Sequence, residues 1–359
     1  MSSVCLFSSN IRPQYEQDII DVAAAPAGHV VRFRYETRYV DDQIREAWSG
    51  NRLTGRDALV LYSIQQPQNY HPPAFIPVRH AIVASSTTEG SVCVIDFRLG
   101  GYAVLRDPAG ADETRGAIVS DFTARLSSTL LGHPGHGRRD RRFSATGGSV
   151  PSGFIAEGLS EAEDFERLSS YLVGTVSFAS HSLWRISAIR EVGDRESIEP
   201  NREGRWRLQS NATYEIVITH YQPDVGGRSF GFATARFDLA TDASLVEIIG
   251  DKQFEVASRY DAIPIRLRVP SLTEVKETVL TIRPHGETKG PRADVRLIVG
   301  PTKGKRAAGG AMAGAAVVLA TIPGMMDKTA GVWDKIWFPV LAAILTFALG
   351  WWALPVRRG

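Results

Sequence analysis

The chain has 359 residues, which is long enough for two compact domains. Its formal net charge of +2 argues against broad nucleic-acid binding, because that function requires a strongly basic surface. The only two cysteines, Cys5 and Cys93, exclude a disulfide scaffold and are consistent with a reducing compartment.

Residues 1–131 are predicted to form a β-rich N-terminal domain with a helix near its end. Runs of β-branched and aromatic residues, separated by Pro, Gly and Asn, are typical of strands. Such runs begin at His29, Ala58, Phe75, Ser91 and Tyr102. Helices are predicted over 41–48 and over 118–131, where apolar residues recur at four-residue spacing. The first residues lack the basic segment and long apolar core of a signal peptide.

Residues 132–153 are predicted to be a Gly/Arg-rich linker or loop, because they contain few apolar residues. His133, His136 and Asp140 are residue types that bind zinc, but the neighbouring arginines would repel a divalent cation, so no metal site is predicted. These arginines are instead candidates for contact with an anion or a partner, and a solvated loop is the alternative. They are Arg138, Arg139, Arg141 and Arg142.

Residues 154–300 are predicted to form a second β domain. Ser160 to Glu163 resemble a capping box that opens a short helix ending near Leu168. From residue 205 onward, strand-like runs follow one another at short intervals, and about six or seven strands in roughly a hundred residues indicate an antiparallel β-sandwich. The predicted fold class is therefore a mainly β (α+β) region with a C-terminal antiparallel β-sandwich, whose core covers about 205–299.

Two uncharged apolar stretches, 307–326 and 336–354, follow a basic flank at 301–306. Because a helix needs about 20 apolar residues to cross a bilayer, they predict a two-helix transmembrane hairpin. Gly310 and Gly314 form a G-x-x-x-G pair that would pack helices together and support self-association. A single C-terminal span after a Gly/Ala linker is the alternative.

Tryptophans near both ends of the second stretch are expected to lie at the membrane interface, because indole favours the headgroup region. They are Trp333, Trp337, Trp351 and Trp352. Lys and Arg flank the outer ends of both stretches, which predicts that the N-terminal domains and the C-terminus lie in the cytosol. The predicted location is a bacterial inner membrane, with the lipid bilayer as a partner.

The basic residues are almost all arginine, and no lysine precedes Lys252. Guanidinium groups suit phosphate and carboxylate, which would indicate a nucleotide or phospholipid partner. Codon usage in a GC-rich bacterial genome explains the same bias.

No catalytic site or cofactor is predicted. Residues 300–305 resemble a phosphate-binding loop but lack its full spacing and its Ser/Thr. Ser149 lies in a polar stretch rather than between a strand and a helix, unlike the nucleophile of a hydrolase. His80, His181 and His220 fall inside apparent strands, and no carboxylate partner can be assigned to them.

Two functional hypotheses follow. The first is a membrane-anchored, cytosol-facing binding or sensor protein whose β domains recognise a partner or ligand. In its sharper form the hairpin is a membrane-disrupting effector, by analogy with bacterial antiphage defence systems. The alternative is a membrane-attached hydrolase or transferase that acts on a nucleotide or lipid, with its site between the N-terminal domain and residues 153–200. A pocket that contains a histidine and a carboxylate would favour the enzyme.

Overall fold

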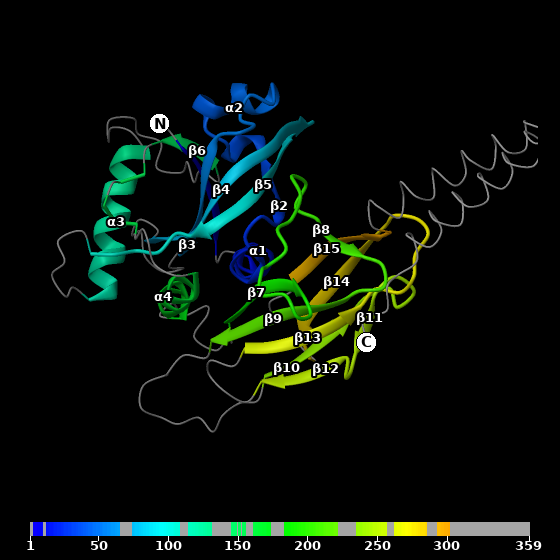
Figure 1. The fold of residues 1–359 in the computed structure, drawn as a ribbon. Coiled ribbons are helices and arrows are strands. Elements are labelled where there is room, and N and C mark those ends of the chain that lie inside the picture. The colour runs from blue at the N-terminus through cyan, green and yellow to red at the C-terminus, as the bar shows by residue number, and fades with distance from the viewer. Residues whose placement is uncertain are drawn as a thin grey trace, which may run out of the picture.

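The structure is a computed structural model, and the part of the chain that it describes is built mainly from β-strands. The described residues are 3–9, 12–64, 74–107, 114–130, 145–148, 150–151, 153–155, 161–173, 183–221, 235–256, 262–285 and 293–301. They form two β-rich units, an N-terminal sheet with helices and a C-terminal sandwich, which lie against each other (Figure 1).

The N-terminal unit contains a six-stranded mixed sheet. In spatial order its strands are β2 (Val30–Glu36), β5 (Val92–Tyr102), β4 (Ala74–Glu89), β3 (Asp57–Ile64), β1 (Ser3–Ser9) and β6 (Ala145–Gly148). Strand β1 pairs in parallel with β3 and in antiparallel with β6. The other neighbours are antiparallel.

Helices contribute apolar side chains to both faces of this sheet. They are α1 (Pro13–Ala24), α2 (Asp42–Ser49), α3 (Arg115–Leu130) and α4 (Glu161–Val173), and a 3-10 turn covers Thr37–Tyr39. The period of two along a strand sends Val4 and Leu6 into a core with α1, α2 and α4, and Cys5 and Phe7 into a core with α3. The sheet is therefore a middle layer.

The C-terminal unit is a sandwich of two sheets. One sheet has the order β12 (Gln253–Val256), β10 (Ala235–Ala240), β14 (Lys276–Pro284), β15 (Ala293–Gly300), β8 (Trp206–Gln209). The other has the order β11 (Glu247–Ile249), β13 (Ala262–Arg268), β9 (Thr213–Tyr221), β7 (Leu183–Glu191). Alternate residues of β9, such as Tyr214, Ile216 and Ile218, point into the shared core.

The sandwich departs from the predicted one in two respects. It begins with β7, before the expected core at 205–299, and β8 pairs in parallel with β15, so it is not wholly antiparallel. Strand β6 also lies within the stretch predicted to be a linker, and β1 and α1 were not predicted.

The two units pack directly against each other around α1. Ala24 at the end of α1 belongs to the sandwich core, whereas Leu183 and Tyr221 of the sandwich belong to the N-terminal core. The His29 ring stacks on the indole of Trp206, with centroids 5.9 Å apart. Helix α1 is therefore the central contact between the units (Figure 1).

The transmembrane hairpin in the predicted fold class needs correction. Within the described residues, no helix has the length and apolar character needed to cross a membrane. The longest, α3, has 16 residues, fewer than the roughly 20 that a span requires, and carries charged side chains among its apolar ones. The stretches 307–326 and 336–354 lie outside the described residues.

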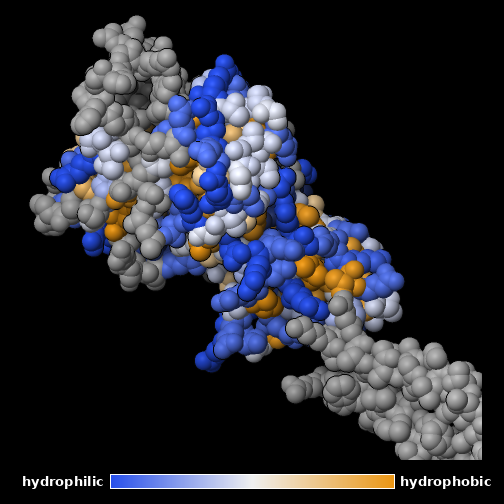
Figure 2. Space-filling model, turned by 90° about the horizontal axis from the view of Figure 1, so that it is seen from above, coloured by the Kyte–Doolittle hydropathy of each residue, from blue (hydrophilic) through white to orange (hydrophobic). Residues whose placement is uncertain are grey.

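The membrane assignment and the inner-membrane location rested on these two stretches, so neither is retained. What the structure supports is a mainly β chain with three sheets in its described part. On the face shown in Figure 2, the described residues are mostly hydrophilic, with smaller hydrophobic areas between them.

Candidate functional site

Arg79 of β4 is fully buried between the N-terminal sheet and the end of α1. A register shift in the β3–β4 pairing, where Val60 pairs with Arg79 but Leu61 with Pro77, places its side chain on the α1 side of the sheet. Its Nε donates to the carbonyl of Val22 (3.4 Å) and its Nη2 to the carbonyl of Ala25. Arg79 therefore caps the negative end of α1.

Tyr102 of β5 supports this guanidinium from one side. The Cζ of Arg79 lies 3.8 Å from the centroid of its ring, which is cation–π geometry. Its hydroxyl donates to the carbonyl of Ala23 (2.8 Å), so the ring orientation is fixed by α1 as well. Burial raises the pKa of Tyr102, against the opposing effect of Arg79 and Arg185, so the phenol stays neutral.

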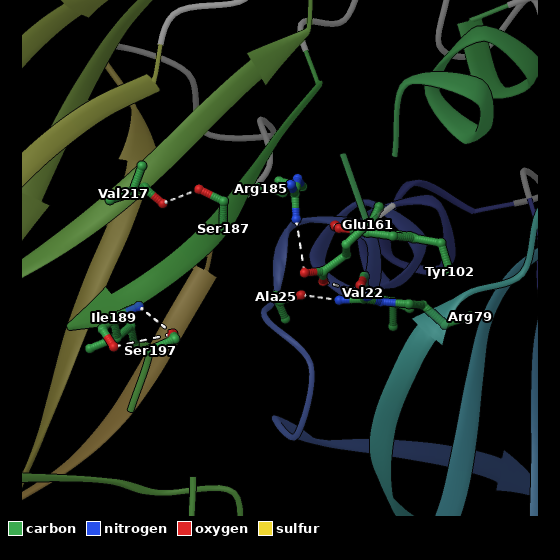
Figure 3. A network of polar contacts seen from close by, with 11 residues as sticks. Val22, Ala25, Arg79, Tyr102, Glu161, Arg185, Ser187, Ile189, Ser197 and Val217 are labelled. Carbon is green, nitrogen blue, oxygen red and sulfur yellow. Dashed lines mark hydrogen bonds and ion pairs between the residues drawn. The ribbon is translucent and has the colours of Figure 1, made fainter. Parts of the chain in front are cut away.

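Arg185 of β7 approaches the same place from the sandwich. Its side chain is 5% exposed, and its Cζ lies 5.6 Å from the centroid of the Phe165 ring of α4. The two buried arginines thus come from different units and point toward one another around α4 (Figure 3).

Glu161, the first residue of α4, provides the carboxylate between them. Its Oε2 lies 3.3 Å from Nη1 of Arg185, and its Oε1 lies 3.7 Å from Nη1 of Arg79 (Figure 3). The side chain is 40% exposed, so it stands at the boundary between the arginines and solvent. A carboxylate here is also favoured by the positive end of the α4 dipole.

This cluster contains two buried cations and one half-exposed anion. Nη1 of Arg79 and both Nε and Nη1 of Arg185 are buried without a hydrogen-bond partner. Leaving charged donors unsatisfied in the interior costs several kcal/mol unless other groups compensate. The α1 carbonyls compensate Arg79 in part, and Arg185 is compensated by Glu161, by a hydrogen bond with Tyr102 and by the ring of Phe165. The arrangement is suited to holding a further negative group.

A recess lies farther along α4. It has a volume of about 340 Å³ and lies between the start of α3, α4 and the end of β9. Its lining residues are Arg115, Glu163, Glu166, Arg167, Ser170 and Tyr221. Nη1 of Arg115 donates to the carbonyl of Ser170 (3.3 Å), which joins α3 to α4.

The residues predicted from the sequence to contact an anion, pack membrane helices or lie at an interface are outside the described part of the chain. They are Arg138, Arg139, Arg141, Arg142, Gly310, Gly314, Trp333, Trp337, Trp351 and Trp352, and these assignments remain predictions. Ser149 and His181 are also outside it.

The other two histidines that the sequence places in strands, His80 and His220, are described. His80 is exposed on β4, and His220 is buried on β9 with its ring 6.3 Å from that of Phe237. Among the described residues, no three His, Cys, Asp or Glu side chains are grouped as a metal site would require.

Sequence reasoning missed both buried arginines. It noted Glu161 only as part of a capping box. One signal was available, because Arg79 and Arg185 each occur in an apolar, strand-like run, FIPVRHAIV and LWRIS, where an interior cation is unusual.

Comparison with protein-family models gives no match. A manganese superoxide dismutase of Corynebacterium diphtheriae is 24% identical over 108 residues, which are 30% of this chain. The chain spans 54% of that relative's length. Among solved structures, the VesB protease of Vibrio cholerae is 10% identical and aligns over 76% of this chain and 96% of its own, with a TM-score of 0.18. Neither similarity shows a family.

Proposed function

We propose that this chain is a binding protein that acts as a sensor, and that it recognises its ligand or partner at the junction of its two β-rich units. The observation that carries the proposal is the cluster of Arg79, Arg185 and Glu161. One buried cation belongs to each unit, and one partly exposed carboxylate on α4 contacts both. A group bound at α4 would therefore affect both units at once.

The recess supports the same location. Its lining carries both signs of charge, from Arg115 and Arg167 and from Glu163 and Glu166. It occupies the region in which the enzyme hypothesis placed its site. Its described lining contains carboxylates but no histidine. It therefore lacks the histidine–carboxylate pair that would favour an enzyme, and its charged lining suits recognition of a polar ligand.

A ligand screen tests this function. The full chain would be screened by thermal shift against nucleotides, sugar phosphates, carboxylic acids and short charged peptides, and hits would be titrated by calorimetry. We expect at least one ligand whose affinity falls roughly tenfold or more in Arg167→Gln, since a charge-assisted contact is lost. The matched control is Arg207→Gln, an exposed arginine of β8.

The proposed location is refuted if Arg167→Gln and Arg207→Gln lose ligand affinity equally, or if neither variant loses affinity. A screen in which no compound class stabilises the chain refutes binding of these small ligands. Circular dichroism would confirm that Arg167→Gln keeps its fold.

A further inference from the structure

We infer that the Arg79–Arg185 pair is a binding site for an oxyanion group, phosphate or carboxylate, and that the Glu161 carboxylate is an internal competitor that occupies the site in the absence of ligand. This inference rests on the proposed function, because it names the chemical class of ligand recognised at the same junction.

The first argument is that both guanidinium groups are held in place before any ligand arrives. Arg79 is fixed by the last carbonyls of α1 and by the ring of Tyr102, and Arg185 lies between β7 and the ring of Phe165. Both arginines are more than nine-tenths buried. Two guanidinium groups that are already held rigidly lose little side-chain entropy on binding, which favours affinity.

The second argument is that Glu161 satisfies this pair poorly. Charge-assisted N–H···O bonds to carboxylates are about 2.7–2.9 Å long. The contacts of Glu161 are 3.3 Å and 3.7 Å, and three guanidinium nitrogens remain without a hydrogen-bond partner. An oxyanion free of the α4 backbone can move closer and accept bonds that Glu161 does not.

The third argument concerns access and charge. Glu161 is 40% exposed, whereas the arginines that it contacts are buried, so this carboxylate is the part of the cluster that a solute in solvent meets first. Glu161 begins α4, so the positive end of that helix dipole also lies beside the pair. Two cations and a helix N-terminus select for a negative group and against neutral or cationic ligands.

Replacement of Glu161 by an external oxyanion has a structural consequence. Glu161 is the ionic link from the start of α4 to both arginines, so its release breaks both ion pairs together while the Phe165 ring stays against Arg185. The bound group would then bridge the units in its place, and only the first turn of α4 would be released, because Phe165, Leu168 and Leu172 keep the helix in the core. This coupling is how binding at the junction could be sensed.

The test uses the full chain and two simple probes, inorganic phosphate and acetate, each compared with chloride at the same ionic strength. In Glu161→Gln the competitor is neutral, so we expect the apparent affinity for at least one probe to rise roughly tenfold over the natural chain. Glu247→Gln, which removes an exposed carboxylate of β11, is the charge-matched control. A response to phosphate alone assigns a phosphate ligand, and a response to acetate alone assigns a carboxylate.

A second variant tests whether the arginines are responsible. In Glu161→Gln combined with Arg185→Lys, residue 185 keeps its positive charge but loses the planar guanidinium that binds an oxyanion through two hydrogen bonds. We expect the affinity gained in Glu161→Gln to be lost. If Glu161→Gln alone folds poorly, its refolding yield in phosphate, acetate and chloride gives the same comparison, and a yield that rises with an oxyanion supports the site.

The inference is overturned if Glu161→Gln and Glu247→Gln respond equally to both probes, or if Arg185→Lys leaves the gain intact. These outcomes are separate from the test of the proposed function. A ligand that depends on Arg167 can still bind when the oxyanion site fails. An oxyanion response can persist when the ligand screen gives nothing at the recess.

Discussion

His29 and Asp18 should give this protein opposing pH dependences that nearly cancel in the natural chain. Burial, with a smaller effect of Arg296, lowers the pKa of His29 to about 4 from its ordinary 6.5. Arg79 acts in the same direction and Asp294 opposes it. Burial raises the pKa of Asp18 to about 6 from 3.8.

The signs follow from which state binds more protons. For His29 the unfolded state binds the proton more tightly, so its contribution to stability is complete above pH 6.5 and is lost as the pH falls to about 4. For Asp18 the folded state binds the proton more tightly, so its contribution is complete below pH 3.8 and is lost as the pH rises through about 6.

The magnitudes are similar. At about 1.4 kcal/mol per pKa unit, the His29 shift corresponds to roughly 3 kcal/mol. Asp18 is only partly buried, and with solvent screening we expect about 2 kcal/mol. Between pH 7.5 and pH 4 the two contributions therefore change in opposite directions and leave a net loss of about 1 kcal/mol in the free energy of unfolding as the pH falls.

Urea unfolding of the natural chain, His29→Gln and Asp18→Asn between pH 4 and pH 7.5 checks this. On acidification, the free energy of unfolding of Asp18→Asn should fall by about 2 kcal/mol more than that of the natural chain, because the Asp18 carboxyl no longer compensates for His29. The free energy of unfolding of His29→Gln should fall by about 3 kcal/mol less than that of the natural chain. Other carboxylates affect all three chains alike, so the differences between curves are the measurement.

Arg207→Gln, at an exposed residue of β8, serves as the surface control and should follow the natural chain. The reasoning is refuted if the curve of His29→Gln runs parallel to that of the natural chain, or if Asp18→Asn becomes less sensitive to acid.

Three further predictions concern packing and reactivity. Phe237→Ala should lower the free energy of unfolding by about 3–5 kcal/mol in urea, because its ring is buried in the sandwich core; a loss below about 1 kcal/mol would contradict that placement. Gly28→Ala should cost more than about 1 kcal/mol, because Gly28 has a φ of +81° and a Cβ there would overlap Pro200; an unchanged urea midpoint would count against it. Native Cys5 and Cys93 should resist a thiol reagent at pH 8 and react after unfolding, because both are buried and burial raises the pKa of Cys5 to about 12; rapid native labelling would disprove this.

Local patterns in the sequence indicated much of the secondary structure. Periodicity at Ile118, Phe122 and Leu126 predicts α3, since those residues face a single core. It did not reveal α1, although Pro13 suits the first turn of a helix and apolar Ile19, Ile20 and Val22 follow. Nor did a purely local pattern show that β8 would pair with β15, because that register joins residues about ninety positions apart.

The candidate site was beyond sequence reasoning for a geometric reason. Simple alternation from Ile76 and Val78 would direct Arg79 to the opposite face of β4. The register shift between Pro77 and Arg79 reverses that phase, and a bulge of this kind has no sequence signature. The meeting of Arg79 with Arg185 further depends on how the two units dock.

The position of β1 constrains the order in which the chain can fold during synthesis. It precedes β3 and β6 in the chain, yet in the sheet it lies between them. Its β6 edge stays unpaired until residue 148 has been translated, so until then the backbone N–H and C=O groups of that edge are open to pairing with another strand.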